Sequence, residues 1–135
     1  MPARDDKVIW RGNSAPPLEW ILPGGVPILG SSFALTIGTE AGALIAKETA
    51  NGTLLLDIEG RRLAWTYTAA ESRLIPEGQI ARFEIERRAG GTEITEIHGF
   101  LSGLGGLNAD ADPAGFSADP SQRDMSSQMM MMGWI

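Results

Sequence analysis

The feature that most restricts the fold of this 135-residue chain is a strand–turn–strand pattern between residues 81 and 101. Apolar and charged residues alternate in Ala81-Arg82-Phe83-Glu84-Ile85-Glu86, as they do in a strand with one buried and one solvated face. Ala89-Gly90-Gly91 then favours a turn, because glycine adopts positive φ without a Cβ clash. The chain returns over residues 92–101. These residues predict an antiparallel β-hairpin.

The returning strand of this hairpin has apolar residues on both of its faces. Ile97 and Leu101 fall on one side, whereas Ile94 and Phe100 fall on the other. We therefore expect both faces of this strand to be covered over part of its length.

Four more segments have the composition of strands: residues 31–37, 42–47, 53–58 and 62–67. The second of them is short and typical of a sheet edge. In the third, Leu54, Leu56 and Ile58 share one face under a two-residue period. Glu59-Gly60 then predicts a tight turn into the fourth strand, with the glycine supplying positive φ.

One short helix is marked by its capping residues. Thr68 and Glu71 have the spacing of a capping box, in which the threonine hydroxyl accepts from the Glu71 amide and the glutamate reaches back to the Thr68 amide. Pro76 and Gly78 follow and prevent a long helix, so at most two turns fit.

Together these elements predict an all-β fold, a small antiparallel β-sandwich with one short helix and an extended C-terminal tail. The sandwich is expected to occupy residues 1–107. Residues 108–135 begin as a linker rich in Gly, Asp, Pro and Ser, which buries too little apolar surface to offset the entropy of ordering its backbone.

The end of the tail is strongly apolar and is interpreted as a docking peptide. Methionine is flexible and polarizable, so a run of it fits irregular apolar grooves. The residues predicted to bind a partner are Met129, Met130, Met131, Met132, Trp134 and Ile135.

Composition argues against several classes of function. A net charge of -6 is unfavourable for a nucleic-acid surface, and the absence of cysteine leaves no disulfide, thiolate metal site or cysteine nucleophile. The polar N-terminal segment lacks the apolar core of a secretion signal, and no apolar run approaches the ~20 residues that span a bilayer. Neither a nucleic acid nor a membrane is an expected partner.

Residues that could carry chemistry are few. His98 is the single histidine and has no cysteine near it in sequence, so a structural role is favoured and no enzyme is expected. The acid pairs Asp5-Asp6, Asp57/Glu59 and Asp110/Asp112 are interpreted as solvated, and no metal or cofactor is predicted. The third pair lacks the glutamate of a calcium loop, since Ser121 stands at the twelfth position.

The tryptophans suggest an alternative function. Trp65 is expected in the core, because it lies in an alternating strand. Trp10 and Trp20 lie beside segments rich in Gly and Pro, where they could cover one end of the sandwich or face a neighbour. On exposed loops they would make the chain a small carbohydrate- or ligand-binding β-module.

The stretch from Leu54 to Gly103 also resembles a known family. Its order is a strand, Asp57-Ile58-Glu59-Gly60, the segment from Leu63 to Ser72, Ile75-Pro76-Glu77-Gly78, the alternating residues 81–86, a glycine turn and a closing strand. This order is similar to Ig-like domains of tailed-bacteriophage structural proteins, such as the N-terminal domains of baseplate upper proteins. The resemblance covers a third to a half of the chain and includes no catalytic residues. The long Gly/Pro segment before Phe33 and the Met-rich tail depart from the family pattern.

The resemblance implies an Ig-like sandwich that serves as a structural or adaptor subunit of a phage virion, in the tail, the neck, a fibre attachment or the head decoration. Its partners would be other virion proteins and copies of itself, in a homo-oligomer. It would be assembled in the host cytoplasm and located in the virion.

Overall fold

A computed structural model describes residues 2–105 of the chain. Residues Met1–Gly103 form one compact unit. The predicted domain limit at residue 107, the linker and the docking peptide lie outside the described residues.

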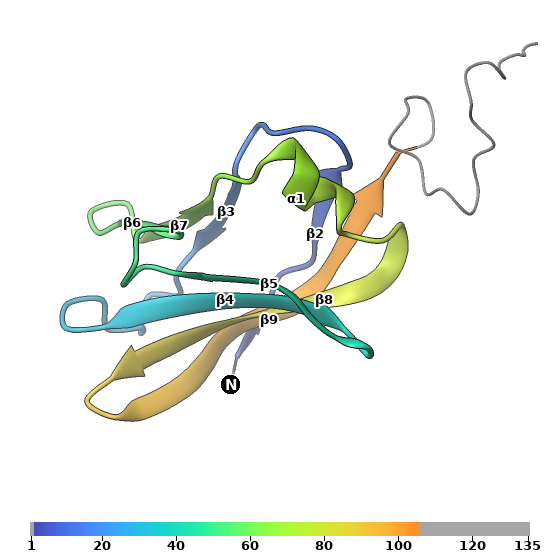
Figure 1. Cartoon of the computed structure of the whole chain (residues 1–135). Helices are drawn as coiled ribbons and strands as arrows, with labels where there is room; N and C mark the ends of the chain where they lie inside the picture. The colour runs from blue at the N-terminus through green and yellow to red at the C-terminus, as the bar shows by residue number, and fades with distance from the viewer. Residues whose placement is uncertain (1, 106–135) are drawn as a thin grey trace, which may run out of the picture. The chain divides into compact units, whose positions relative to one another are not determined.

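The described region contains nine strands and one short helix (Figure 1). In chain order these are β1 (Ala3–Arg4), β2 (Lys7–Trp10), β3 (Leu18–Ile21), β4 (Ser32–Thr39), β5 (Gly42–Glu48), β6 (Leu55–Asp57), β7 (Arg62–Trp65), α1 (Ala69–Arg73), β8 (Gly78–Ala89) and β9 (Thr92–Leu104). No helix in this part of the chain is long and apolar enough to cross a membrane.

The strands form two sheets. The larger has the order β1-β9-β8-β4-β5, with β2 also paired to β9, and the smaller has the order β3-β7-β6. This is the strand distribution of an immunoglobulin sandwich: β3, β7 and β6 take the places of strands B, E and D, and β5, β4, β8 and β9 take those of C′, C, F and G. The predicted all-β, Ig-like sandwich with one short helix is therefore confirmed. Strand β1 pairs with β9 in parallel, whereas the pairs β3–β7, β6–β7, β4–β5, β4–β8 and β8–β9 are antiparallel.

The hairpin predicted over residues 81–101 is present as β8 and β9. Gly90 and Gly91 connect the two strands with φ values of 57° and 81°, and Ala89 pairs with Thr92. Two positive φ values in a two-residue loop match the twist of the flanking strands, which is why two glycines stand here.

Helix α1 also agrees with its prediction. The Glu71 amide donates to Thr68 Oγ1 and the Thr68 amide donates to Glu71 Oε1, each at 3.0 Å, which completes the capping box. Lys47 on β5 contacts the same carboxylate at 2.5 Å. Burial opposes ionisation of Glu71, but the hydrogen bonds from Lys47 and Thr68 outweigh it and hold the pKa of Glu71 below its usual value.

Two details of the predicted 53–58 strand are wrong. The strand is shorter, because a turn begins at Ile58, whose side chain is exposed. In that turn the positive φ belongs to Arg61 (52°) and not to Gly60. Glycine is needed at 60 for space instead, since a Cβ there would collide with the Asp57 carboxylate that accepts from the Gly60 amide at 3.1 Å.

Strand β3 lies in the Gly/Pro-rich segment where the sequence indicated irregular structure. Long-range contacts hold it: the Tyr67 hydroxyl donates to the Pro16 carbonyl at 2.6 Å, and Arg61 Nη2 donates to the carbonyls of Pro23 and Val26 at 2.6 and 2.8 Å. Burial raises the pKa of Tyr67. Four residues between prolines are too few for a periodic signal, so these contacts decide the strand.

The core fills the space between the two sheets. Trp20 of β3 contacts Phe83 of β8 with ring centroids 5.4 Å apart, and Trp65 of β7, as predicted, is fully buried. In antibody domains a disulfide joins strands B and F at the place of β3 and β8. In this cysteine-free chain an aromatic pair joins the same two strands.

Candidate functional site

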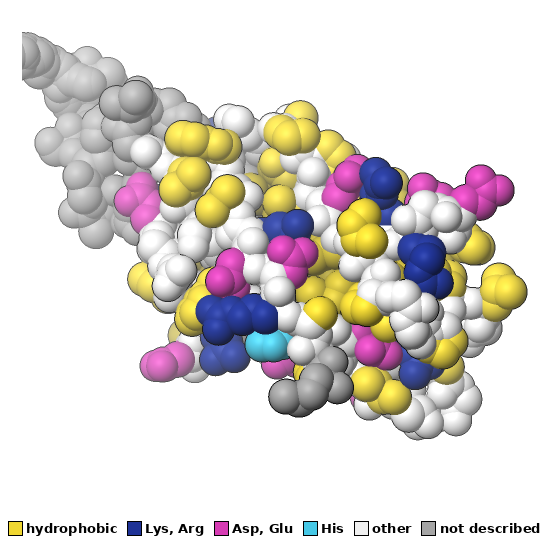
Figure 2. Space-filling model, turned by 180° about the vertical axis from the view of Figure 1, so that it is seen from behind, with side chains coloured by type: hydrophobic (Ala, Val, Ile, Leu, Met, Phe, Trp, Pro, Cys, Tyr) yellow, Lys and Arg dark blue, Asp and Glu magenta, His cyan; other side chains and the backbone are white. Residues whose placement is uncertain are grey.

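The larger sheet has an outer face that the smaller sheet does not cover. The alternation of β8 places Ala81, Phe83 and Ile85 in the core and leaves Arg82 and Glu84 outside. Seen from the side opposite to Figure 1, the histidine lies beside basic side chains, with acidic and apolar ones around them (Figure 2).

An open hollow of about 900 Å³ occupies one end of this outer face. It extends from the β4–β5 turn across β8 to β9, and we call it the outer-face hollow. Its lining includes Thr36, Glu40, Ile80, Arg82, Glu84 and Phe100.

Two bulges shape the hollow. On β5, Leu44 is an extra residue between the pairs Ile37↔Ile45 and Gly38↔Ala43. A Cβ at Gly38 would lie 2.8 Å from the Gly42 carbonyl oxygen, so only glycine allows this close approach. A bulge bends its strand and increases its twist, which re-aims the β4–β5 tip relative to the sheet.

The second bulge is at the start of β8. Two residues, Gln79 and Ile80, stand opposite one residue of β9 between the pairs Gly78↔Gly103 and Ala81↔Leu101. Ile80 is 58% exposed and lines the hollow. The sandwich therefore presents a large apolar side chain to solvent beside charged residues.

Phe100 lies at the β9 end of the hollow with two guanidinium groups near its ring, and we call this end the basic end. Cζ of Arg4 lies 5.5 Å from the centroid of the ring, and Cζ of Arg82 lies 5.8 Å from it. The prediction that both faces of β9 are covered is met only in part: Phe100 is half-buried with two cations near its ring, whereas Ile94 is exposed. Such contacts stabilise by about 0.5–1 kcal/mol when exposed.

Arg82 differs from its neighbours in having no carboxylate partner among residues 2–105. Arg4 contacts Asp6 at 3.2 Å and Arg87 contacts Glu96 at 2.9 Å. Arg82 is exposed on the central strand β8, where its guanidinium group makes a cation–π contact with the ring of Phe100. A guanidinium in this position keeps its donors available to an incoming group.

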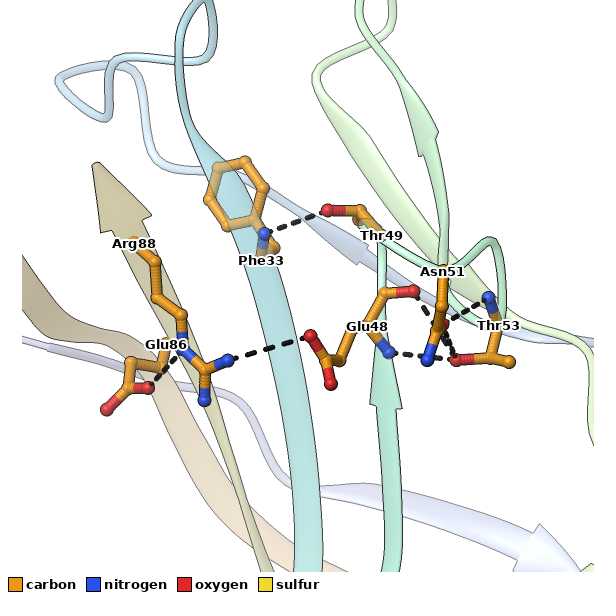
Figure 3. Close-up of polar contacts among 7 residues, drawn as sticks. All are labelled: Phe33, Glu48, Thr49, Asn51, Thr53, Glu86 and Arg88. Atoms are coloured by element: carbon orange, nitrogen blue, oxygen red, sulfur yellow. Dashed lines mark hydrogen bonds and ion pairs between the residues drawn. The ribbon is translucent and has the colours of Figure 1, made fainter. Parts of the chain in front are cut away.

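The opposite end of the sheet is saturated with polar contacts, as Figure 3 shows. Arg88 contacts Glu86 at 2.9 Å and Glu48 at 3.6 Å. The hydrogen bond that Arg88 donates to Glu86 is the largest cause that raises the pKa of Arg88. The Glu48 amide donates to Thr53 Oγ1 at 2.9 Å, and that hydroxyl donates to Asn51 at 2.6 Å. Two arginines on one strand face therefore have very different surroundings.

The N-terminal strands fix the position of Phe100. The Phe100 amide donates to Asp6 Oδ1 at 3.0 Å, and the Asp5 amide donates to the His98 carbonyl at 2.9 Å. The hydrogen bond from Phe100, followed by that from Arg4, lowers the pKa of Asp6. Gly99 allows the N-terminal segment to pass this close to β9, because a Cβ at residue 99 would lie 2.7 Å from the Asp5 carbonyl oxygen.

The other predicted site residues have varied outcomes. Met129, Met130, Met131, Met132, Trp134 and Ile135 lie outside the described residues. His98 is half-buried on the outer face and pairs with Glu84 in the β8–β9 register. Within residues 2–105 no three His, Cys, Asp or Glu side chains are grouped so that they could hold a metal ion.

The suggestion that Trp10 and Trp20 stand on exposed loops is wrong in part. Both lie on strands, Trp10 on β2 and Trp20 on β3. Trp20 is 1% exposed, so it cannot stack on a ligand, whereas Trp10 is 53% exposed. The paired aromatic platform of the carbohydrate-binding alternative is therefore not formed.

No protein-family model matches the sequence. No curated protein matches it either. Among solved structures, the chain is similar to the insect immune protein hemolin, with 10% identity, a TM-score of 0.41, and coverage of 88% of this chain and 28% of that one. It is also similar to extracellular domains 3–5 of Drosophila OTK, with 11% identity, a TM-score of 0.33, and coverage of 76% and 33%.

These likenesses are too distant to indicate a function. The chain spans about a third or less of the length of each of these structures. Its fold is established by the order of its own strands.

Sequence reasoning did not single out Arg4, Arg82 and Phe100 as a group. Arg82 was recognisable as solvent-facing from the alternation of β8, and Phe100 as lying on the side of β9 opposite to Leu101. Their meeting depends on the β8–β9 register and on the parallel pairing of β1, which no local pattern reveals.

Proposed function

We propose that the chain is a non-enzymatic structural or adaptor subunit of a tailed-phage virion, which joins neighbouring subunits through its C-terminal segment. The virion setting is supported by the resemblance of residues 54–103 to Ig-like domains of phage structural proteins. The place in the virion, whether tail, neck, fibre attachment or head decoration, stays open in this proposal.

The observation that carries the docking role is the outer-face hollow. It is open, it combines an exposed isoleucine with an aromatic ring and Arg82, and it spans three neighbouring strands of one sheet, with Arg4 close to the same ring. Aromatic residues and arginine are enriched where proteins dock on one another. A surface of this kind suits contact with a protein segment.

Deletion of residues 125–135 tests the proposal. In the phage that encodes the chain, the truncated protein should keep its β-sheet circular dichroism and thermal transition. It should disappear from purified particles, as measured by quantitative immunoblot against the major capsid protein. Incorporation of the truncated protein at the level of the full chain would contradict the proposal.

A matched deletion controls for the loss of length. Removing residues 108–118, the same number of residues from the linker, leaves the Met-rich end in place. This variant should enter particles at more than half of the normal level.

A further inference from the structure

The outer-face hollow contains an arginine that has no acidic partner among the described residues. In a chain of net charge -6, Arg82 is exposed at the centre of a sheet with no carboxylate within ion-pair distance among the described residues. Arg4, on the strand that flanks β9 on its other edge, lies near the same aromatic ring. The basic end of the hollow therefore suits a segment that is acidic and apolar at once.

The acidic side chains of the hollow do not cancel this preference. Glu40 lies on the β4–β5 turn, away from β9, and Glu84 stands opposite His98 in the register. The hollow therefore has Glu40 at its turn end and Arg82 with Phe100 at its basic end, and Arg4 of β1 adjoins the basic end. An extended segment that lies across it meets both ends in a fixed direction.

The same chain contains a segment with the complementary chemistry. Residues 106–135 have four aspartates (Asp110, Asp112, Asp119 and Asp124) against one arginine, and then the apolar run from Met129 to Ile135. A tryptophan ring stacks well on a guanidinium, and methionines adapt to irregular apolar walls such as that around Ile80.

The length of the linker allows this segment to reach another molecule. Residues 106–128 separate the end of the described sandwich from the Met run. A chain of this length spans at most about 75 Å when fully extended. A folded unit of about 100 residues has a radius of gyration of about 13 Å, so the next copy is within reach.

We infer that the outer-face hollow of one copy binds the Met129–Ile135 segment of a second copy, with Arg82 and Phe100 as the central contacts. The inference rests on the proposed function and names the receptor for its docking segment. A contact between a tail and a face is heterologous, so repeated copies close into a ring or extend as a filament.

Self-association of the full chain tests the receptor. Sedimentation equilibrium should show that Arg82→Ala raises the dissociation constant about tenfold or more, the effect of a central arginine contact. Arg88→Ala is the matched control: it removes the same charge from the same strand and face, but from the end where Glu86 and Glu48 already bind the arginine. It should change the constant less than twofold.

Cysteine cross-linking tests where the tail lies, because the chain has no native cysteine. Gln79→Cys places a thiol on the rim of the hollow and Gly133→Cys places one between Met132 and Trp134. Oxidation of a mixture of the two full-length variants should give the heterodimer in excess of both homodimers, by intact mass. Glu19→Cys, exposed on the smaller sheet, should not cross-link to Gly133→Cys above background.

The outcomes separate the inference from the proposed function. If deletion of residues 125–135 abolishes association but Arg82→Ala behaves like Arg88→Ala, the tail docks elsewhere; the receptor is wrong and the proposed function stands. If a double variant with both Gln79→Cys and Gly133→Cys forms its disulfide only within one chain, the tail binds the hollow of its own copy, and the inference that it binds a second copy is wrong. If the full chain stays monomeric at all concentrations, the inference fails, and particle incorporation then decides the proposed function separately.

Discussion

The two faces of the larger sheet are built by the same two-residue alternation and have opposite surroundings. On β8 the inward residues Phe83 and Ile85 are at most 1% exposed, whereas the outward residues Arg82 and Glu84 are in solvent. The smaller sheet covers the inner face, through contacts such as that between Trp20 and Phe83. The outer face has no covering layer within the described residues.

The difference between the two faces identifies the side chains on which the stability of the fold depends. Side chains on the inner face lose stability when truncated, because neighbouring groups cannot collapse into the space. Side chains on the outer face, such as Arg82, are expected to contribute little to folding, so substitutions there can test the proposed docking without unfolding the sandwich. The four predictions below test this division.

The largest expected effect is that of Trp20→Ala. Removing a fully buried ring that joins the two sheets should lower the free energy of unfolding by about 3–5 kcal/mol, measured by urea denaturation. Trp10→Ala removes the same side chain from an exposed position on β2 and should change this energy by about 0.5 kcal/mol or less. Equal losses for the two variants would contradict the division between core and surface.

Gly99→Ala should have the next largest effect. The new Cβ would meet the Asp5 carbonyl oxygen at 2.7 Å, and since this is a backbone atom the N-terminal strand must move, at a cost of about 1–3 kcal/mol. Hydrogen exchange at the Asp5 and Phe100 amides should accelerate more than exchange at β4. Gly24→Ala is the control, because a Cβ there has no atom within 4 Å; a similar loss for both variants would refute the steric explanation.

Glu71→Gln should cost up to about 1 kcal/mol at pH 7, the usual upper value for an ion pair that is not deeply buried. Glutamine can keep the capping box, so the loss reports mainly on the charge that faces Lys47. The folded pKa of Glu71 lies below its ordinary value of 4.5, so its contribution is complete above that value and is lost as pH falls through the folded pKa.

The difference between the wild type and Glu71→Gln should therefore be present at pH 7 and vanish in strong acid, in urea denaturation repeated across pH. Glu59→Gln, in the exposed β6–β7 turn, serves as the control with a change of about 0.5 kcal/mol or less. A difference that persisted unchanged in strong acid would show that the charge of Glu71 is not its source.

The smallest expected effect on folding is that of Arg82→Ala, about 0.5 kcal/mol, since an exposed cation–π contact is weak and Arg4 still covers the Phe100 ring. Thermal unfolding at a concentration too low for association would measure it. A loss above about 2 kcal/mol would mean that the outer face also holds the fold together, and the comparison of the two faces would fail.

Local signals in the sequence were sufficient for several elements. Gly90-Gly91 specified the β8–β9 turn, because two positive φ values are needed there, and Thr68 with Glu71 specified the start of α1 through reciprocal hydrogen bonds three residues apart. Alternation along β8 specified which side chains enter the core. Each of these signals acts within a few residues, so the sequence reveals it directly.

Tertiary structure alone decided the remaining features. Strand β3 depends on Tyr67 and Arg61, which bind carbonyl groups at least 35 residues away in sequence. The cluster of Arg4, Arg82 and Phe100 exists because β1 pairs with β9 and brings Arg4 to the ring that Arg82 reaches from β8. Pairing between distant strands is set by packing energy across the whole domain, so a period of two residues predicts which side of a strand faces solvent and not which side chains meet there.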